Sequence, residues 1–345
     1  GDVDGDGWVD IYLCLLDQPN VLYRNLGGWR FEDVTQTSGT GLLGRLSRGA
    51  VFADADGDGD LDLFVAVHAG SNPLLFNDGT GVFEERSAGF EPQYGTNTLA
   101  LADIDGDSDL DAYFTNYKNI QGDDLFSPTE RNLRGYVQQI GDELIVLPPY
   151  DAHYRLQLVG DRSLRFELGD PDEFYLNDGS GHFTLVDMTG GMFRTAAGAS
   201  IAETQRDWGL VARFFDADDD GDPDLYVAND FGSRDGFWIN QGGWFRAASG
   251  LELRTTSASS MGVDFSDVDG DGDTDFITTE MLARDQIRRR GQAVGTVVQR
   301  TPPGRADMRA PTGRNTLQLN RGDGTFAEVG RGAGIAASEW TWGAM

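Results

Sequence analysis

The sequence has few of the residue types that build redox or transition-metal sites. Among its 345 residues there is one cysteine, Cys14, and there are three histidines. A single cysteine excludes an intrachain disulfide and gives no zinc site. Lysine is equally scarce, because Lys118 is the only one and every other basic residue is arginine. No run of about 18 apolar residues occurs, which excludes a membrane-spanning helix from this segment.

Positive charge is scarce overall. The 57 acidic residues outnumber the 27 basic ones and leave a formal net charge of −30. That excess of negative charge argues against nucleic acid or an anionic membrane surface as a partner. The chain is instead rich in aspartate and in glycine, with 47 glycines, and 39% of its residues are hydrophobic. This composition indicates a sizeable core with many tight turns, as in all-β proteins with short strands.

Five acidic stretches, which we call acid loops one to five, repeat along the chain. Each has aspartate at its positions 1, 3, 5 and 9, and strand-like apolar residues follow. The loops read DVDGDGWVD from Asp2, DADGDGDLD from Asp54, DIDGDSDLD from Asp103, DADDDGDPD from Asp216 and DVDGDGDTD from Asp267. A β-hairpin pattern follows each loop and begins at Asn20, Asn72, Asp172, Asp235 and Asn315. Self-similarity with a period near 50 residues indicates a repeat architecture.

The spacing of the aspartates predicts metal binding. Oxygen ligands at positions 1, 3 and 5, with glycine at position 6 for a sharp turn, suit a hard cation such as calcium. An EF-hand is excluded, because position 12 is never glutamate and the flanks are strand-like. The alternative is that these are solvated Asp-Gly turns that bind no metal. Five copies in the same register argue against it. We therefore predict up to five calcium ions, in preference to magnesium or manganese, on Asp2, Asp4, Asp6, Asp10, Asp54, Asp56, Asp58, Asp62, Asp103, Asp105, Asp107, Asp111, Asp216, Asp218, Asp220, Asp224, Asp267, Asp269, Asp271 and Asp275.

Together the two motifs resemble the FG-GAP or VCBS repeat of integrin-α-type β-propellers. The segments TTEMLARDQIRRR (278–290) and RNTLQLNRGDGTFAEVGRGAGIAASEWTWGAM (314–345) are more specifically similar to the cartilage-acidic-protein (ASPIC/UnbV) group. The resemblance implies a propeller of four-stranded antiparallel blades, with calcium in the loop that joins the first two strands of a blade. It also implies secretion, and it supplies no catalytic residues.

On this reading residues 1–345 hold about five blades' worth of propeller. The chain opens beside position 1 of a loop and stops short of a sixth, so we expect a fragment of a longer chain whose ring has seven or eight blades, with a closed five-blade ring as the alternative. Loop one, with no strand before it, and loop three, where Ser108 replaces the turn glycine, are expected to be the weakest sites. Recurring apolar residues are predicted to form the blade core, namely Trp8, Phe31, Phe64, Phe83, Tyr226 and Phe245.

Two insertions, 118–171 and 281–314, lengthen the same connection in two different repeats, so both should emerge on one face, opposite the calcium. The first contains DELIVLPPYD and RSLRFELGD, which predict strands of its own. The second holds eight arginines against two aspartates and predicts one short helix followed by irregular chain. On that face we predict a ligand surface from His68, Asn116, Tyr117, Asn229, Asp230, Glu280, Arg288, Arg289 and Arg290. Turn chemistry is the alternative for the residues at strand ends. For the arginines the alternative is that the insertion folds onto the chain's own acidic face.

These observations favour a calcium-stabilised binding, adhesion or protein-interaction module, with structural calcium. The expected location is extracellular, periplasmic or at the cell surface, with any signal peptide outside this segment. The expected partner is a protein or an acidic glycan, because a guanidinium fork suits carboxylates and sulfates. A polysaccharide-acting enzyme of the lyase type and a scaffold subunit of a larger bacterial assembly remain as alternatives. A lyase would need a general base beside a cationic side chain, and no base stands out.

Overall fold

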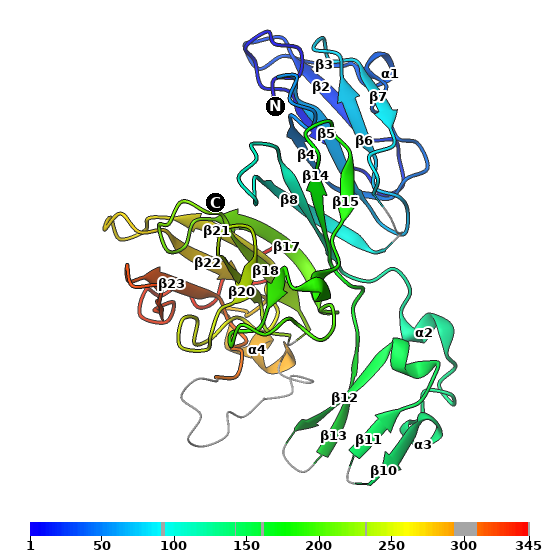
Figure 1. Ribbon diagram of the computed structural model, residues 1–345, viewed down its shortest axis with the longest axis vertical. Coiled ribbons are helices and arrows are strands. Elements are labelled where there is room, and N and C mark those ends of the chain that lie inside the picture. Colours follow the sequence, from blue (N-terminus) through cyan, green and yellow to red (C-terminus); the bar gives the residue numbers. More distant parts are fainter. Residues whose placement is uncertain (91–93, 142, 160–161, 232, 293–308, 344–345) are drawn as a thin grey trace.

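The computed structural model describes residues 1–345 apart from 91–93, 142, 160–161, 232, 293–308 and 344–345. Within the described residues the chain forms five consecutive antiparallel sheets, which we number blades 1 to 5, and two insertions leave them (Figure 1). In each blade the acid loop precedes a strand of largely apolar residues, and the predicted hairpin supplies the next two strands. The all-β fold of propeller-like blades predicted from the sequence is confirmed.

Blade 1 has three strands, and blade 2 shows the complete repeat. The strands of blade 1 are β1 (Ile11–Leu13), β2 (Val21–Asn25) and β3 (Phe31–Asp33), and the short helix α1 (Thr35–Ser38) follows them. Blade 2 has the order β4 (Ser47–Ala53), β5 (Asp62–Val67), β6 (Leu74–Asn77) and β7 (Phe83–Arg86). Loop two joins β4 to β5, so the acid loop lies between the first two strands of a blade, as expected.

The other three blades keep this order. Blade 3 consists of β8 (Thr96–Ala102), β9 (Asp111–Asn116), β14 (Glu173–Asn177) and β15 (Phe183–Leu185). Blade 4 consists of β17 (Trp208–Phe215), β18 (Asp224–Asp230), β19 (Gly236–Asn240) and β20 (Phe245–Ala247), with β16 (Phe193–Arg194) added in parallel to β20 after the 3₁₀ turn Met188–Gly190. Blade 5 consists of β21 (Gly262–Ser266), β22 (Asp275–Thr279), β23 (Thr316–Asn320) and β24 (Phe326–Glu328).

The hydrophobic core lies between blades rather than inside one of them. Successive side chains of a strand point to opposite faces of its sheet. Thus Leu63 and Val65 of β5 pack against blade 1, whereas Phe64 and Ala66 pack against blade 3. Burial on both faces explains why the second strands read as continuous apolar runs. Equivalent clusters join blades 3 and 4 and blades 4 and 5.

Four of the six predicted core residues are buried: Phe64, Phe83, Tyr226 and Phe245. The prediction is wrong for Trp8, which is 51% exposed, and Phe31 is only half-buried. Trp8 occupies position 7 of loop one, where the other four loops carry aspartate, and its indole packs over the turn at Gly27.

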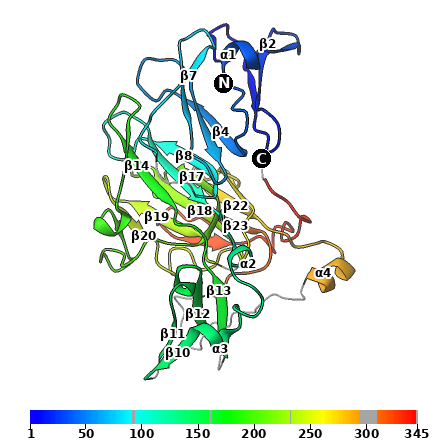
Figure 2. The ribbon, with the colours of Figure 1, turned by 90° about the vertical axis from the view of Figure 1, so that its right-hand side faces the viewer.

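The first strands of blades 2 to 5 lie side by side in chain order, as the innermost strands of a propeller do. The acid loops leave one end of these strands. Both insertions join a second strand to a third and therefore leave the opposite end, which we call the insert-bearing face. Figure 1 shows the first insertion as a separate lobe beyond the blades, with α4 at their lower edge, and Figure 2 shows the same elements from the side.

The first insertion has the strands that its sequence predicted. Two hairpins pair β10 (Val137–Ile140) with β11 (Glu143–Val146) and β12 (Tyr154–Val159) with β13 (Arg162–Glu167). Three short helical segments, α2 (Gly122–Leu125), α3 (Leu133–Tyr136) and the 3₁₀ turn Tyr150–Ala152, complete the lobe. Its interior is aromatic, since the Tyr136 ring stacks on Tyr150 with centroids 4.5 Å apart and lies 5.9 Å from Tyr154.

The predicted short helix of the second insertion is α4 (Gln286–Gln292). The irregular chain expected after it lies largely outside the described residues. In the part of the chain that the structure describes, no helix is long and apolar enough to cross a membrane.

Candidate metal centres

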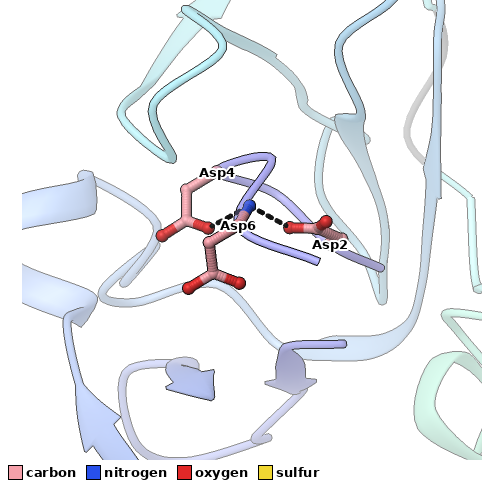
Figure 3. Close-up of side chains that lie close together, drawn as sticks. All are labelled: Asp2, Asp4 and Asp6. Carbon is pink, nitrogen blue, oxygen red and sulfur yellow. Dashed lines mark hydrogen bonds between the residues drawn. The ribbon is translucent and has the colours of Figure 1, made fainter. Parts of the chain in front are cut away.

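Each acid loop gathers three carboxylates at one point. In loops one, two, three and five these belong to positions 1, 3 and 5, and the chosen oxygens lie within 4.8 Å of one another. In loop four the triplet is Asp216, Asp218 and Asp224, so that position 9 replaces position 5. Figure 3 shows the three side chains of loop one around the backbone nitrogen of Asp6. That N–H donates to Asp2 at 3.2 Å and to Asp4 at 3.3 Å, and so the turn itself holds the carboxylates together.

Position 1 shapes the turn. The backbone N–H groups of Gly57 and Gly59 donate to the two oxygens of Asp54 at 2.8 and 3.0 Å, and loops three and five repeat both bonds. Position 5 accepts in the same way from the N–H two residues later, for example from Asp60 to Asp58 at 2.9 Å. The carboxylates are therefore positioned by backbone N–H donors before any cation binds.

Position 9 has a different part in the loop. Asp62 is 1% exposed, and its two oxygens accept the N–H groups of Ala55 at 2.9 Å and Asn77 at 2.8 Å. The same pair of bonds recurs in all five repeats and ties the acid loop to the hairpin of its own blade. Each oxygen keeps a second lone pair, so a metal contact stays available in addition. Burial raises the pKa of the Asp111 and Asp224 carboxyls to about 7.

Unsatisfied oxygen atoms show that the loops suit a cation. Oδ1 of Asp56 and Oδ1 of Asp216 are buried without a hydrogen-bond partner in the described part of the chain. Buried carboxylate oxygens are normally paired, and an unpaired one is costly. Hard divalent cations, calcium above all, bind such oxygens without demanding a rigid geometry. The donor set and the orphaned oxygens therefore fit a calcium ion.

Two loops replace a turn glycine. At position 6 glycine has φ between 89° and 101° in four loops, and Ser108 adopts 80° in loop three. Its N–H still donates to Asp103 at 3.1 Å, so the loop keeps its shape at a cost in backbone strain of about 1 kcal/mol. In loop four Asp219 holds φ 59° at position 4, where the other loops have glycine. Sequence reasoning had noted Ser108 but missed Asp219.

An arginine side chain already pairs with the carboxylates of loop one. Arg24 of β2 lies 2.5 Å from Asp4 and 3.4 Å from Asp6, measured from its guanidinium nitrogens to their carboxylate oxygens. The residues before the equivalent hairpin asparagines are apolar in the other blades: Phe76, Leu176, Ile239 and Leu319. Because a guanidinium competes with a metal ion for the same oxygens, loop one is the least suited of the five to calcium.

The asparagine of each hairpin makes a contact that sequence reasoning missed. The Asn177 side chain donates to the carbonyl oxygen of Ala55 at 2.9 Å, and Ala55 is position 2 of the acid loop in the preceding blade. Asn77, Asn240 and Asn320 do the same to Val3, Ile104 and Ala217. Asparagine at this position in all five hairpins was the available signal. These bonds place the acid loops in one row and connect each of loops one to four to the next blade.

The residues predicted for the ligand surface have different surroundings. Asn116 and Asn229 are buried, and their side-chain amides donate to the carbonyl oxygens of Pro171 and Arg234, shortly before the third strand of their blades. Tyr117 donates to Asp230 at 3.0 Å and so joins blades 3 and 4. Glu280 is 7% exposed, and burial raises the pKa of its carboxyl to about 7.

His68 is half-buried, and both burial and the nearby Arg48 lower the pKa of its imidazole. The three arginines lie on the exposed helix α4. Arg288 approaches Glu339 to 3.4 Å, and Arg289 donates to the Ala283 carbonyl oxygen.

The fold and its loops define a propeller-type repeat protein in which every blade has an acid loop. A family model for the FG-GAP-like repeat matches residues 2–65, 54–114 and 216–278, just over half of the chain. The chain therefore belongs to the FG-GAP-like repeat family.

Solved structures show weaker similarities. A lectin of Agrocybe aegerita, described as recognising non-reducing terminal N-acetylglucosamine, shares 15% identity over 93% of this chain and 80% of its own, with a TM-score of 0.33. BBS1N in complex with ARL6DN shares 12% over 78% and 71%, with a TM-score of 0.32. The V. cholerae biofilm matrix protein Bap1 shares 10% over 82% and 65%, with a TM-score of 0.28. No curated protein matches the chain. Similarities at these TM-scores carry no weight for function.

Proposed function

We propose that this chain is a calcium-stabilised recognition module that works outside the cytoplasm, with structural calcium in the acid loops and ligand binding on the insert-bearing face. Within its family we place it closest to the cartilage-acidic-protein (ASPIC/UnbV) group, on the segments 278–290 and 314–345. The observation that carries the proposal is the contrast between five nearly identical carboxylate triplets at one end of the blades and two unrelated insertions at the other.

A structural role for calcium follows from how the loops are connected. Asp62 ties loop two to the hairpin of its own blade, and Asn177 ties the same loop to blade 3. A cation that fixes the shape of the loop therefore also fixes the packing of two blades. At about ten times its dissociation constant, each ion contributes about 1.4 kcal/mol to the free energy of unfolding. Extracellular sites of this kind bind calcium at about 10⁻⁴–10⁻³ M.

The recognition part of the proposal rests on α4. Its arginines belong to an insertion with eight arginines in a protein of net charge −30, and the Arg288 side chain is 73% exposed. The helix is attached to the C-terminal part of the chain, because Arg284 and Arg288 both contact Glu339. The remaining guanidinium groups offer forked donors to carboxylate or sulfate groups of a partner protein or an acidic glycan.

Heparin, a sulfated glycan, tests this surface. The variant in which Arg288, Arg289 and Arg290 are all alanine should bind heparin more weakly and with a shallower salt dependence, while its melting temperature stays near that of the wild type. Arg45→Ala is the matched control, because Arg45 pairs with Glu85 in blade 2, away from α4. A large fall in melting temperature without loss of heparin binding would make α4 a structural clasp and would contradict the proposal.

A further inference from the structure

A cleft of about 450 Å³ lies between blade 4 and the first insertion. Its lining includes Phe237, Trp238 and Leu253, which are at most 5% exposed, and the half-buried Ala247 and Ala248. Its polar lining comes from Arg155 of β12, from Gln205 and Asp207 before β17, and from Ser233 and Arg234 after β18. A hollow of this volume in which several polar groups converge is within the range of small-molecule sites.

Comparison with the other blades shows what is special about this cleft. Blade 2 has a cleft of about 400 Å³ in the corresponding place, with Glu85 and Arg86 on its outer strand. Hairpin register aligns these two residues with Ala247 and Ala248 of blade 4. In blade 5 the corresponding residue is Glu328, which is paired with Arg314. Charged side chains thus occupy this position in blades 2 and 5, whereas alanines leave it open in blade 4.

The polar groups of the blade 4 cleft are held in place and balanced in charge. Arg155 lies 3.7 Å from Asp207, and the Ser233 hydroxyl hydrogen-bonds the same carboxylate. Arg234 donates to the Leu253 carbonyl oxygen at 3.0 Å and interacts electrostatically with Asp235. Each arginine therefore has an acidic neighbour, so the cleft does not select an anion. Together with Gln205, these groups supply both donors and acceptors.

We infer that the cleft between blade 4 and the first insertion binds a neutral saccharide. A sugar ring has hydroxyl groups that both donate and accept at its edge, and a C–H face that packs on apolar surface. Arg155, Asp207 and Gln205 match the hydroxyls, and the half-buried Ala247 and Ala248 offer apolar surface to the C–H face. The inference rests on the proposed function in placing recognition beside the insertions, but it assigns a different ligand from the acidic partner expected at α4.

Saturation-transfer NMR with the methyl glycosides of glucose, galactose, mannose and N-acetylglucosamine tests the inference. At least one of them should bind the wild type. Arg155→Ala and Asp207→Asn should each weaken that binding about tenfold or more, because each removes a hydrogen bond to a charged group. Arg86→Ala, in the cleft of blade 2, is the matched control and should leave binding unchanged.

The inference is overturned if none of these glycosides binds the wild type, or if binding survives Arg155→Ala. Arg155 is 49% exposed at its side chain, so this variant should fold even if Asp207→Asn does not. Heparin binding and the calcium dependence of the melting temperature, measured on the same variants, should stay as in the wild type. A failure of the saccharide site is thereby separated from a failure of the proposed function.

Discussion

The two ends of the blades differ in how far the repeats resemble one another. At the acid-loop end, position 1 fixes the turn and position 9 fixes the hairpin in all five repeats, and an asparagine from the next blade bonds to each of loops one to four. At the insert-bearing end, the same strand position is His68, Tyr117 or Asp230 in successive blades, and two connections carry unrelated insertions. Uniformity suits a structural role that every blade needs, whereas variation suits recognition by particular blades.

The largest effect should come from position 9. Asp224→Ala removes the acceptor of two buried N–H groups, from Ala217 and Asn240, and should cost about 2–5 kcal/mol in the free energy of unfolding. The cost should remain in excess EDTA, because these bonds do not need metal. Asp218→Ala, at position 3 of the same loop, is the control and should destabilise only when calcium is present. Chemical denaturation with and without EDTA measures the free energy of unfolding of both variants. If the two variants depend on calcium in the same way, positions 3 and 9 do not have different roles.

The next effect concerns the bonds between blades. Asn177→Ala should cost about 1–3 kcal/mol, since it leaves the buried Ala55 carbonyl oxygen without its partner. Asn25→Ala is the matched control, because the Asn25 side chain donates to Val9 of its own loop. It should cost less in the same denaturation experiment. If Asn25→Ala is as costly as Asn177→Ala, the hairpin asparagine serves its own blade only.

Loop three offers a stabilising change. Ser108→Gly should raise the free energy of unfolding by about 1 kcal/mol, because glycine adopts a φ near 80° without strain. Gly59→Ser in loop two should lower it by a similar amount and serves as the reverse test. Thermal unfolding of both variants in calcium measures the difference. Destabilisation by Ser108→Gly would mean that the serine side chain contributes to the loop.

The smallest effect is expected in loop one, where Arg24 occupies the carboxylates. Arg24→Leu copies the residue at the equivalent position of blade 3, Leu176, and frees Asp4 and Asp6. It should strengthen calcium binding at this loop by about tenfold or less, as expected for removal of a half-exposed ion pair. Calorimetric titration should then detect an additional strong site. An unchanged titration curve would show that Arg24 does not compete with calcium.

Much of this arrangement could be predicted from the sequence, and the reason is repetition. A single acid loop is ambiguous, but copies that begin at Asp2, Asp54, Asp103, Asp216 and Asp267 fix the period, the strand before and after each loop, and the position of the insertions. The strands on both sides of loops two to five, and the strand after loop one, confirm that an EF-hand is excluded.

Contacts that depend on three-dimensional neighbours could not be predicted in the same way. Pairing of Arg24 with loop one needs the register of β1 and β2, and the cleft at Asp207 needs the position of the first insertion. Exposure of Trp8 follows from its place in the loop rather than in a strand. A hydrophobic pattern alone cannot show these features, because it records spacing and not neighbours.

Thermal unfolding at increasing calcium concentration tests the central claim most directly. In EDTA the carboxylates of each loop repel one another, so the melting temperature should be at its lowest. It should rise with calcium over about 10⁻⁴–10⁻² M, and magnesium at the same concentrations should raise it less. A melting curve that is the same in EDTA and in excess calcium would contradict structural calcium in the acid loops.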